Sequence, residues 1–414
     1  MSFAPHEPDS RDPLVRDARG QALLFLPEPA CPSCPYRLKG RCTGPTLSSL
    51  RPPHGEVIGC LDPLRQATYY EDLHRRLPPR TPNPPPPPAL PAFVPVLARG
   101  VPKNTVLRGA HLYGVGWNSL ISKAGTLMYR TPEHLRRSLR LKEDARVCLI
   151  GTGYDESLES FWIKSEPHEA FGQIAALDLA FSTTTTYSVW DDHPRFDQIY
   201  NQERNLATYE WLTGHGVPTI PFLFCALDSD YIAAAKWLDE HSEVEIVATS
   251  AQGYKGQLRF YEFMADLRRL QQITNRPIRF LVVGICSGWK IDLLYEHFPI
   301  AAIVSGLPFG VGRSGHLCNA NLSGRPRAPQ NIPRSRLVEE CIATCANYCA
   351  ARALAASSRK VSEVIQTDLP IRETERNPDR SLSDGEVPHP LLTRRDRQDA
   401  EVQDAERIVA LRAG

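Results

Sequence analysis

Eight of the eleven cysteines in this 414-residue chain fall into two sets of four. Four thiolates in one region can hold a tetrahedral zinc ion or an iron–sulfur cluster. In a reducing compartment, clustered cysteines are more often metal ligands or redox groups than disulfides. We therefore predict two metal sites, one formed by Cys31, Cys34, Cys42 and Cys60 and the other by Cys318, Cys341, Cys345 and Cys349.

The amino-terminal set has the spacing Cys-x2-Cys-x7-Cys-x17-Cys, and Pro32 and Pro35 directly follow its first two members. Proline after a ligating cysteine is a habit of ferredoxin-type sequences, which favours a [4Fe-4S] cluster, with zinc as the alternative. Residues 1–77 form a segment so short that a metal would have to supply much of its folding energy.

In the second set, Cys341, Cys345 and Cys349 recur every four residues, which places them on one face of a helix. We predict that Cys318 completes a zinc site with them, and a buried helix stripe is the alternative. The other three cysteines, Cys148, Cys225 and Cys286, lie within or at the ends of apolar runs, so we expect them to pack in the core.

The chain divides by composition into four parts. A proline-dominated stretch at 78–95 predicts a stiff linker between the cysteine-rich segment and the main domain. Residues 96–356 contain the predicted α/β barrel with its zinc segment. Residues 357–414 are rich in charge and poor in aromatic residues, and this composition predicts a disordered tail.

Apolar β-branched runs alternate with stretches of helical period along the main domain, which is typical of parallel strands joined by helices. The absence of a Gly-rich nucleotide-binding loop argues against a doubly wound sheet, so we predict a TIM-type (β/α)8 barrel. Predicted strands are 147–151, 175–181, 219–224, 245–249, 279–284 and 301–304, with two more at 93–97 and 111–117; predicted helices are 196–213, 229–240, 257–273 and 289–297.

Net charge, apolar runs and local charge bear on the partners and the compartment of this protein. The formal net charge is +1, which by itself argues for neither nucleic acid nor membrane. We find neither a membrane-spanning apolar run nor a secretory signal, so we expect a cytoplasmic protein. A stretch without acidic residues carries Arg325, Arg327, Arg334 and Arg336, which either contact phosphates or form a solvated face.

In a barrel the active site lies at the carboxyl ends of the strands, so polar residues just after each apolar run are the informative ones. Carboxylates there can act as nucleophiles or as acid/base groups, and our candidates are Asp155, Asp178 and Asp191. Predicted substrate contacts in the same positions are Ser182, Thr186, Gln252, Ser305, Arg313 and His316.

The stretch from Ser305 to Pro308 and from Gly312 to Leu317 resembles the last barrel strand and loop of tRNA-guanine transglycosylases, which carry Leu-Pro, Arg-x-Gly and often His-Leu motifs. Residues 340–354, with Glu-Cys, Thr-Cys, Asn-Tyr and Ala-Leu pairs, are similar to the zinc segment of that family. Residues 180–188 resemble its second substrate-contacting loop. Residues 146–304 also resemble an uncharacterised α/β domain of phage and mobile-element proteins, around 198–201 and 216–221.

The resemblance implies a base-exchange enzyme that replaces guanine or a 7-deazaguanine in tRNA or DNA, with zinc as cofactor. Three departures stand beside it. Val304 and Ser305 occupy the place of the family's nucleophilic aspartate, and the spacing of the second cysteine set differs from that family's zinc pattern. The family's base-holding aspartate has no clean counterpart either, although Asp155 lies in the corresponding loop. The alternatives are a non-catalytic nucleic-acid-binding protein of a mobile element, and an iron–sulfur redox protein. The sequence does not indicate the oligomeric state.

Overall fold

The fold is described from a computed structural model, which defines residues 15–16, 22–23, 34, 36, 63–98, 101, 106–164, 166–189 and 194–358. The predictions for Cys31, Cys42, Cys60, Asp191 and the tail at 357–414, apart from its first two residues, therefore lie outside the described residues. Before the main body, β1 (Val15–Arg16) and β2 (Ala22–Leu23) pair as a short antiparallel ribbon.

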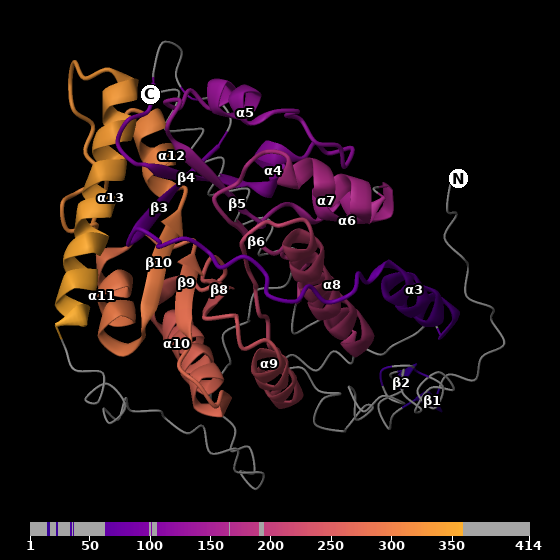
Figure 1. The fold of residues 1–414 in the computed structure, drawn as a ribbon. Coiled ribbons are helices and arrows are strands. Elements are labelled where there is room, and N and C mark those ends of the chain that lie inside the picture. The colour runs from indigo at the N-terminus through magenta and orange to yellow at the C-terminus, as the bar shows by residue number, and fades with distance from the viewer. Residues whose placement is uncertain are drawn as a thin grey trace, which may run out of the picture.

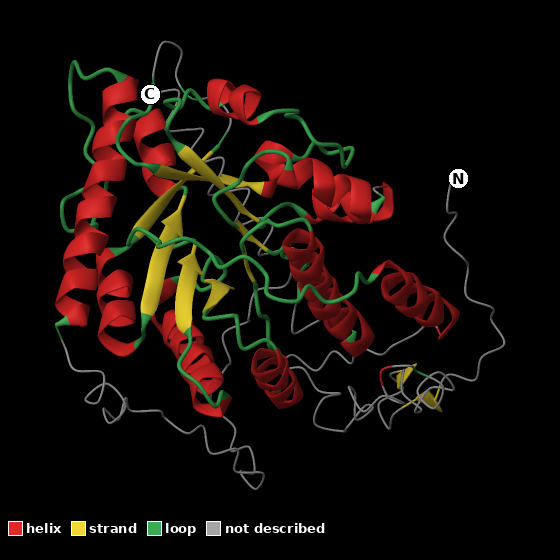
Figure 2. Cartoon of the chain, viewed as in Figure 1, coloured by secondary structure: helices red, strands yellow, loops and turns green. Residues whose placement is uncertain are grey.

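Eight parallel strands form a TIM-type barrel, as predicted (Figures 1 and 2). In chain order each strand pairs with the next, and the last, β10, returns to the first, β3. Closure between β7 and β8 comes from a parallel bridge of Phe222 with Ala248, where the Ala248 amide donates to the Pro221 carbonyl at 2.8 Å. The strands are β3 (Phe93–Leu97), β4 (Leu112–Gly116), β5 (Arg146–Ile150), β6 (Ser182–Thr183), β7 (Thr219–Ile220), β8 (Ile246–Ser250), β9 (Arg279–Val283) and β10 (Ile300–Ser305).

Helices surround the barrel and supply most of the crossovers (Figure 1). α12 and α13 follow the last strand and pack against each other and against β3. Gly312 makes this packing close, because a Cβ there would lie 2.4 Å from the Val338 Cα. The helices are α3 (Pro63–Arg76), α4 (Trp117–Leu120), α5 (Pro132–Ser138), α6 (Asp155–Lys164), α7 (Pro167–Ala175), α8 (Arg195–Gly214), α9 (Asp228–Glu240), α10 (Gly256–Ile273), α11 (Gly288–His297), α12 (Leu307–Arg313) and α13 (Arg334–Ser357).

The lumen of the barrel is filled by apolar side chains from its whole circumference. Val94, Ile150, Phe222, Leu281 and Val304 are among its buried members. Outside the strands, two larger apolar clusters fill the space beneath the helices, one on the β3–β6 side and one on the β8–β10 side. Since burying one such side chain contributes roughly 1.5–3 kcal/mol, these three clusters are the main source of stability.

α3 and the proline-rich stretch lie against the barrel. Leu73 of α3 is fully buried, and the Tyr69 ring stacks on Tyr200 of α8 with 5.4 Å between ring centroids. Further along, Arg80 pairs with Glu243 at 3.3 Å, and Leu90 packs against the lumen cluster. The first barrel strand begins at Phe93, inside the range that we predicted as linker.

Most predicted elements agree with the structure to within about two residues at each end. Two predicted strands are exceptions: β7 ends at Ile220, four residues before the end predicted at 224, and the strand predicted at 175–181 does not form. There α7 ends at Ala175, the chain turns at Asp178 with φ of 52°, and β6 begins only at Ser182. Leu177, Leu179 and Phe181 are buried although they belong to no strand. Their apolar run therefore has the same sequence pattern as a buried strand.

Gly151, directly after β5, packs so closely against Thr184, directly after β6, that it leaves no room for a side chain. A Cβ on Gly151 would lie 1.8 Å from the Thr184 carbonyl oxygen, so Gly151→Ala must push β5 and β6 apart. We expect a loss of about 1–3 kcal/mol in the free energy of unfolding, measured by urea denaturation. Gly253→Ala is the control, since nothing lies within 4 Å of its Cβ position. Equal effects of the two substitutions would contradict the close packing.

Candidate functional site

Asp155 is the predicted carboxylate that the structure describes at the carboxyl ends of the strands. It opens α6, directly after the loop that follows β5, and its side chain is exposed. A carboxylate in the first turn of a helix is favoured by the helix dipole. Its Oδ1 accepts a hydrogen bond from the Ser188 Oγ at 2.7 Å, so one oxygen is held by the loop after β6.

The hydroxyl residues of β6 and the threonine that follows it support the barrel wall. Ser182 and Thr183 are buried, and the Ser182 hydroxyl donates to the Thr183 carbonyl at 2.7 Å. The Thr183 Oγ1 accepts from the Gly151 amide, and the Thr184 Oγ1 accepts from the Phe222 amide. Ser182 is therefore a wall residue and is inaccessible to a substrate. Thr186, four residues later, is half-buried at the rim.

The loop after β6 is held by α8 through a buried arginine. The Arg204 guanidinium is 3% exposed, lies 3.8 Å from the Tyr187 ring centroid, and donates two hydrogen bonds to Glu159 of α6 at 2.7 and 2.8 Å. Burial disfavours its charge, but these bonds to Glu159 raise the pKa of Arg204 above its ordinary value. The Asn205 side chain accepts from the Tyr187 amide, which orients the loop that carries Ser188.

α8 also orders the loop after β7. Gln202 donates to the Phe224 carbonyl at 3.0 Å, and Arg195 forms a buried ion pair with Asp230 of α9. Asp230 further accepts from the amides of Ala226 and Leu227. Although burial opposes its ionisation, the bonds from Arg195 hold the pKa of Asp230 below its ordinary value. This carboxylate is fully engaged and is a structural group.

The remaining predicted substrate contacts lie after β8 and β10. Gln252 is exposed, and its side chain covers Gly284, where a Cβ would lie 2.2 Å from the Gln252 Cγ. Ser305 ends β10 almost fully buried, and its Oγ accepts from the Leu307 amide at 3.3 Å. Arg313 lies 5.8 Å from the centre of the Phe309 ring. The last of these residues, His316, is half-buried, and its carbonyl accepts from the Cys341 thiol at 3.4 Å.

Asp178 is not at this end of the barrel. It precedes β6, at the amino ends of the strands, and its exposed carboxylate pairs with Arg136 at 3.4 Å. The expected position of Asp178 at the mouth is therefore wrong, because the residue belongs to a turn before the strand. Asp191, the third candidate, lies outside the described residues.

The second cysteine set comes together around a cysteine that the sequence did not single out. The Sγ atoms of Cys286 and Cys345 are 3.0 Å apart, and the Cys318 amide donates to the Cys341 Sγ at 3.2 Å. Cys341, Cys345 and Cys349 are all fully buried on one face of α13, as the spacing of four predicts. Cys286 follows β9. Because it ends an apolar run, the sequence predicted only that it packs in the core.

Hydrogen bonding shifts the pKa values of these thiols in opposite directions. Hydrogen bonds from Cys341 and then Cys345 lower the pKa of the Cys318 thiol to about 4, against opposition from burial. The pKa values of Cys341 and Cys345 are raised, mainly by their bonds to Cys318 and Cys286 respectively. As the side chains stand, the described residues contain no group of three or more His, Cys, Asp or Glu arranged around a metal position. Of the amino-terminal set, Cys34 alone is described, half-buried.

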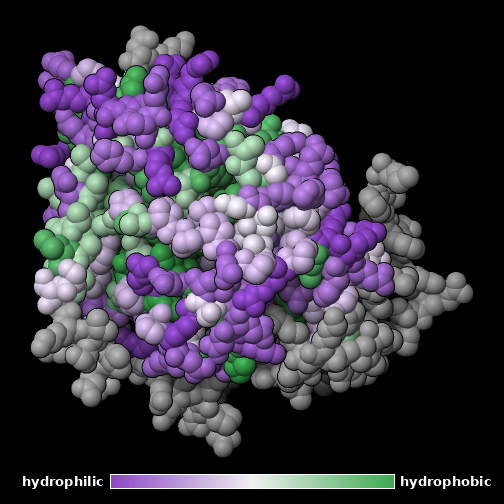
Figure 3. Space-filling view, in the orientation of Figure 1, coloured by the Kyte–Doolittle hydropathy of each residue, from purple (hydrophilic) through white to green (hydrophobic). Residues whose placement is uncertain are grey.

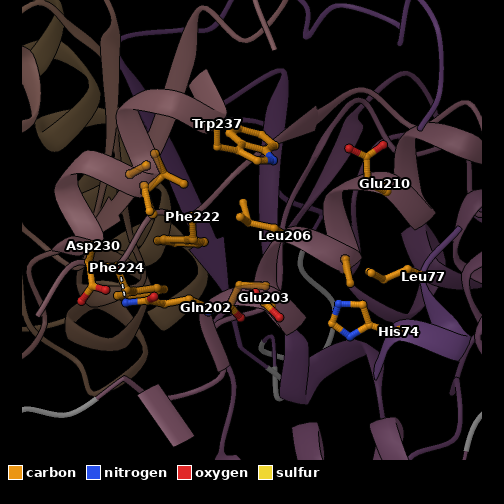
Figure 4. A pocket seen from close by; sticks show the side chains of 15 residues that line it. His74, Leu77, Gln202, Glu203, Leu206, Glu210, Phe222, Phe224, Asp230 and Trp237 are labelled. Carbon is orange, nitrogen blue, oxygen red and sulfur yellow. Dashed lines mark hydrogen bonds between the residues drawn. The ribbon is translucent and has the colours of Figure 1, made fainter. Parts of the chain in front are cut away.

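A pocket of about 300 Å³ lies outside the strands, lined by α3, α8, α9 and the segment after β7 (Figure 4). His74, Leu206, Glu210, Phe222 and Trp237 are among its lining residues. None of the predicted site residues lines it, and its polar groups are partly engaged: Glu210, for example, bonds to His241 at 3.0 Å. The pocket therefore includes the segment that follows β7 but none of the candidate residues.

The segment between α12 and α13 presents a basic surface. Leu317 and Arg327 pair through two backbone hydrogen bonds of 2.8 and 3.0 Å, and Arg325, Arg327, Arg334 and Arg336 are all exposed. In Figure 3 the surface over the start of α13 and the loop before it is strongly hydrophilic. Among the described helices, none combines the length and apolar character needed to span a bilayer.

Comparison with known proteins gives a structural likeness alone. No protein-family model and no curated protein matches the chain. One of the solved structures that match is a 4-hydroxy-2-oxoglutarate aldolase/2-deydro-3-deoxyphosphogluconate aldolase from TTHB1, at 12% identity, covering 62% of this chain and 94% of that one. The TM-score is 0.31, which supports no inference about activity.

The contacts of Arg204 with Glu159 and Tyr187 predict that two arginine-to-lysine substitutions differ in their effect on the free energy of unfolding. Lysine cannot reproduce the two-pronged bond to Glu159 or the stacking on Tyr187, so we expect Arg204→Lys to lower the free energy of unfolding by about 1–3 kcal/mol. Arg259→Lys is the control, because its ion pair with Glu262 is exposed and should contribute about 0.2–1 kcal/mol at most. Urea denaturation measures the free energy of unfolding of both variants. An unchanged value for Arg204→Lys would contradict a stabilising role for these contacts.

Proposed function

We propose that this chain is a base-exchange enzyme that replaces guanine or a 7-deazaguanine in tRNA or DNA, with Asp155 as its catalytic carboxylate. The observation that carries the proposal is the position of Asp155 at the carboxyl ends of the strands, held by Ser188 from the neighbouring loop. Barrel enzymes place their catalytic groups at that end. The resemblance of residues 305–317 and 340–354 to tRNA-guanine transglycosylases indicates the reaction class.

In such a reaction a carboxylate oxygen attacks the anomeric carbon of the ribose while the bond from that carbon to the base nitrogen breaks. The departing base keeps the electron pair of that bond and takes up a proton. The incoming base then displaces the carboxylate and loses its own proton. Ser188 donates to one oxygen of Asp155, which leaves the other oxygen for attack. Thr186 and Gln252, at the rim, are the groups that we assign to hydrogen bonds with the extruded base.

Arg313 at the end of α12 and the exposed arginines after it suit a polyanionic substrate. Their segment follows the eighth strand, so it begins at the same end of the barrel as Asp155. Guanidinium groups form two-pronged hydrogen bonds with phosphate oxygens. We assign Arg313, Arg325 and Arg327 to contacts with the nucleic-acid backbone.

A second candidate function is a nucleic-acid-binding protein without catalysis. Ser305 favours it, because this residue and Val304 stand where the transglycosylases carry their aspartate. The Ser305 hydroxyl is almost fully buried and accepts a hydrogen bond from Leu307. Neither Val304 nor Ser305 can supply a carboxylate. The two candidates differ in whether Asp155 is required for a reaction.

The base-exchange proposal predicts different effects for two aspartates. Asp155→Asn removes the nucleophile, and we expect it to reduce incorporation of labelled guanine or 7-deazaguanine into tRNA or duplex DNA by at least about 100-fold. Asp178→Asn is the control, since Asp178 lies at the other end of the barrel and asparagine tolerates its positive φ. Incorporation that survives in Asp155→Asn would remove this residue from catalysis. No incorporation by the unaltered protein, with binding retained, would support the second candidate.

The basic segment predicts a salt-dependent loss of binding. We expect Arg325→Ala with Arg327→Ala to weaken binding and to reduce the slope of log K against log salt by about 1–2, through fewer released counterions. Arg259→Ala with Arg279→Ala is the control, because both arginines are exposed and lie in exposed ion pairs away from this segment. Fluorescence anisotropy with labelled tRNA and duplex DNA at several salt concentrations measures both pairs. Equal slopes for the two double variants would exclude this segment as the contact surface.

A further inference from the structure

Four thiols from three separate parts of the chain meet beside the carboxyl end of β9. Cys286 lies in the loop after this strand, Cys318 follows α12, and Cys341 and Cys345 lie on successive turns of α13. The Cys286 and Cys345 sulfurs are 3.0 Å apart, and the Cys318 thiol accepts hydrogen bonds from those of Cys341 and Cys345. The spacing of cysteines along α13 accounts for two of the four. The tertiary fold brings the other two to them.

We infer that Cys286, Cys318, Cys341 and Cys345 bind one tetrahedral zinc ion, with Cys286 as the ligand that comes from the barrel itself. Four thiolates are a common ligand set of closed structural zinc sites. Cys349, which we predicted from the sequence as a ligand, lies one helical turn further along α13, near Cys286, Asp292 and Tyr295. Cys286 replaces Cys349 in the proposed ligand set.

The spacing of the sulfurs favours a single ion over an iron–sulfur cluster. Two thiolates bound to one zinc at about 2.3 Å each lie about 3.8 Å apart. Cys286 and Cys345 need to separate by less than an ångström from their 3.0 Å contact to reach that spacing. A [4Fe-4S] cluster would have to fit four iron and four sulfide ions between the thiolates, and thiols already in contact leave no such space.

The surroundings of the four thiols also suit a cation. An amide, that of Cys318, donates to the Cys341 sulfur at 3.2 Å, the kind of outer-shell bond that orients a metal-bound thiolate. Cys341 and Cys345 are buried, whereas Cys286 and Cys318 are half-buried, so an ion can enter from their side.

A zinc ion here would fasten three elements at once. It would join α13 to the loop between β9 and α11, and it would fix the start of the arginine-bearing segment at Cys318. Gly284, two residues before Cys286, contacts Gln252 at the rim. The ion would thereby order both the basic segment and one side of the barrel end. The inference does not depend on the proposed base exchange, and binding of zinc can be tested without a substrate.

The test compares zinc content among full-length variants that all keep the amino-terminal cysteines, so that any metal held there cancels. Elemental analysis should show about one zinc ion per chain fewer in Cys286→Ser than in the unaltered protein. Cys286→His, which keeps a zinc ligand at this position, should retain the ion. Cys349→Ser and Cys225→Ser are the controls and should lose none. Circular dichroism verifies that each variant is folded.

Alkylation of individual cysteines in the unaltered protein gives a second measurement, which does not depend on whether the variants fold. In the unaltered protein, peptide mass mapping should find Cys286 and Cys318 protected from iodoacetamide until a zinc chelator is added. Retention of all zinc by Cys286→Ser, or loss of one ion from Cys349→Ser, would overturn the assignment. A Cys286–Cys345 disulfide in the freshly purified protein, or alkylation unaffected by the chelator, would also overturn it.

Discussion

The apolar packing of the barrel lumen is the constraint on which the rest of this structure depends. Side chains such as Val94, Ile150, Leu281 and Val304 fill the interior, and unpaired charge in such a medium would cost several kcal/mol. Within the described residues, the acidic side chain that is almost fully buried, Asp230, lies outside the lumen and is paired with Arg195. Any chemistry at the barrel must therefore come from groups on the loops at its ends.

α8 connects those loops to the scaffold. Its residues bond to the loop after β6 through Asn205, to α6 through Arg204, and to the segment after β7 through Gln202. A long helix in the ring is rigid, so loops bonded to one helix keep a fixed relation to one another. The hydrogen bond between Ser188 and Asp155 is a product of that arrangement, since each residue lies on a segment that Arg204 or Asn205 supports.

On the other side of the barrel, α12 and α13 complete the ring next to β3. Gly312 permits their close contact, and Cys345 of α13 contacts Cys286 in the loop after β9. The basic segment between these helices is anchored at both of its ends, by the pairing of Leu317 with Arg327 and by the start of α13. The proposed phosphate contacts and the inferred zinc site thus share one support, and the catalytic proposal depends on the opposite side.

The sequence by itself determined the barrel, because buried parallel strands read as apolar runs and crossover helices as amphipathic ones, and both signals are local. It also located Asp155 after a strand and placed three cysteines on one helix face. Tertiary structure decided the rest. Asp178 belongs to a turn at the far end although its neighbours are apolar, and Ser182 is used by the wall. Cys286 joins the thiols only because α11, which follows its loop, packs against α13, and a contact between residues 59 positions apart leaves no pattern along the chain.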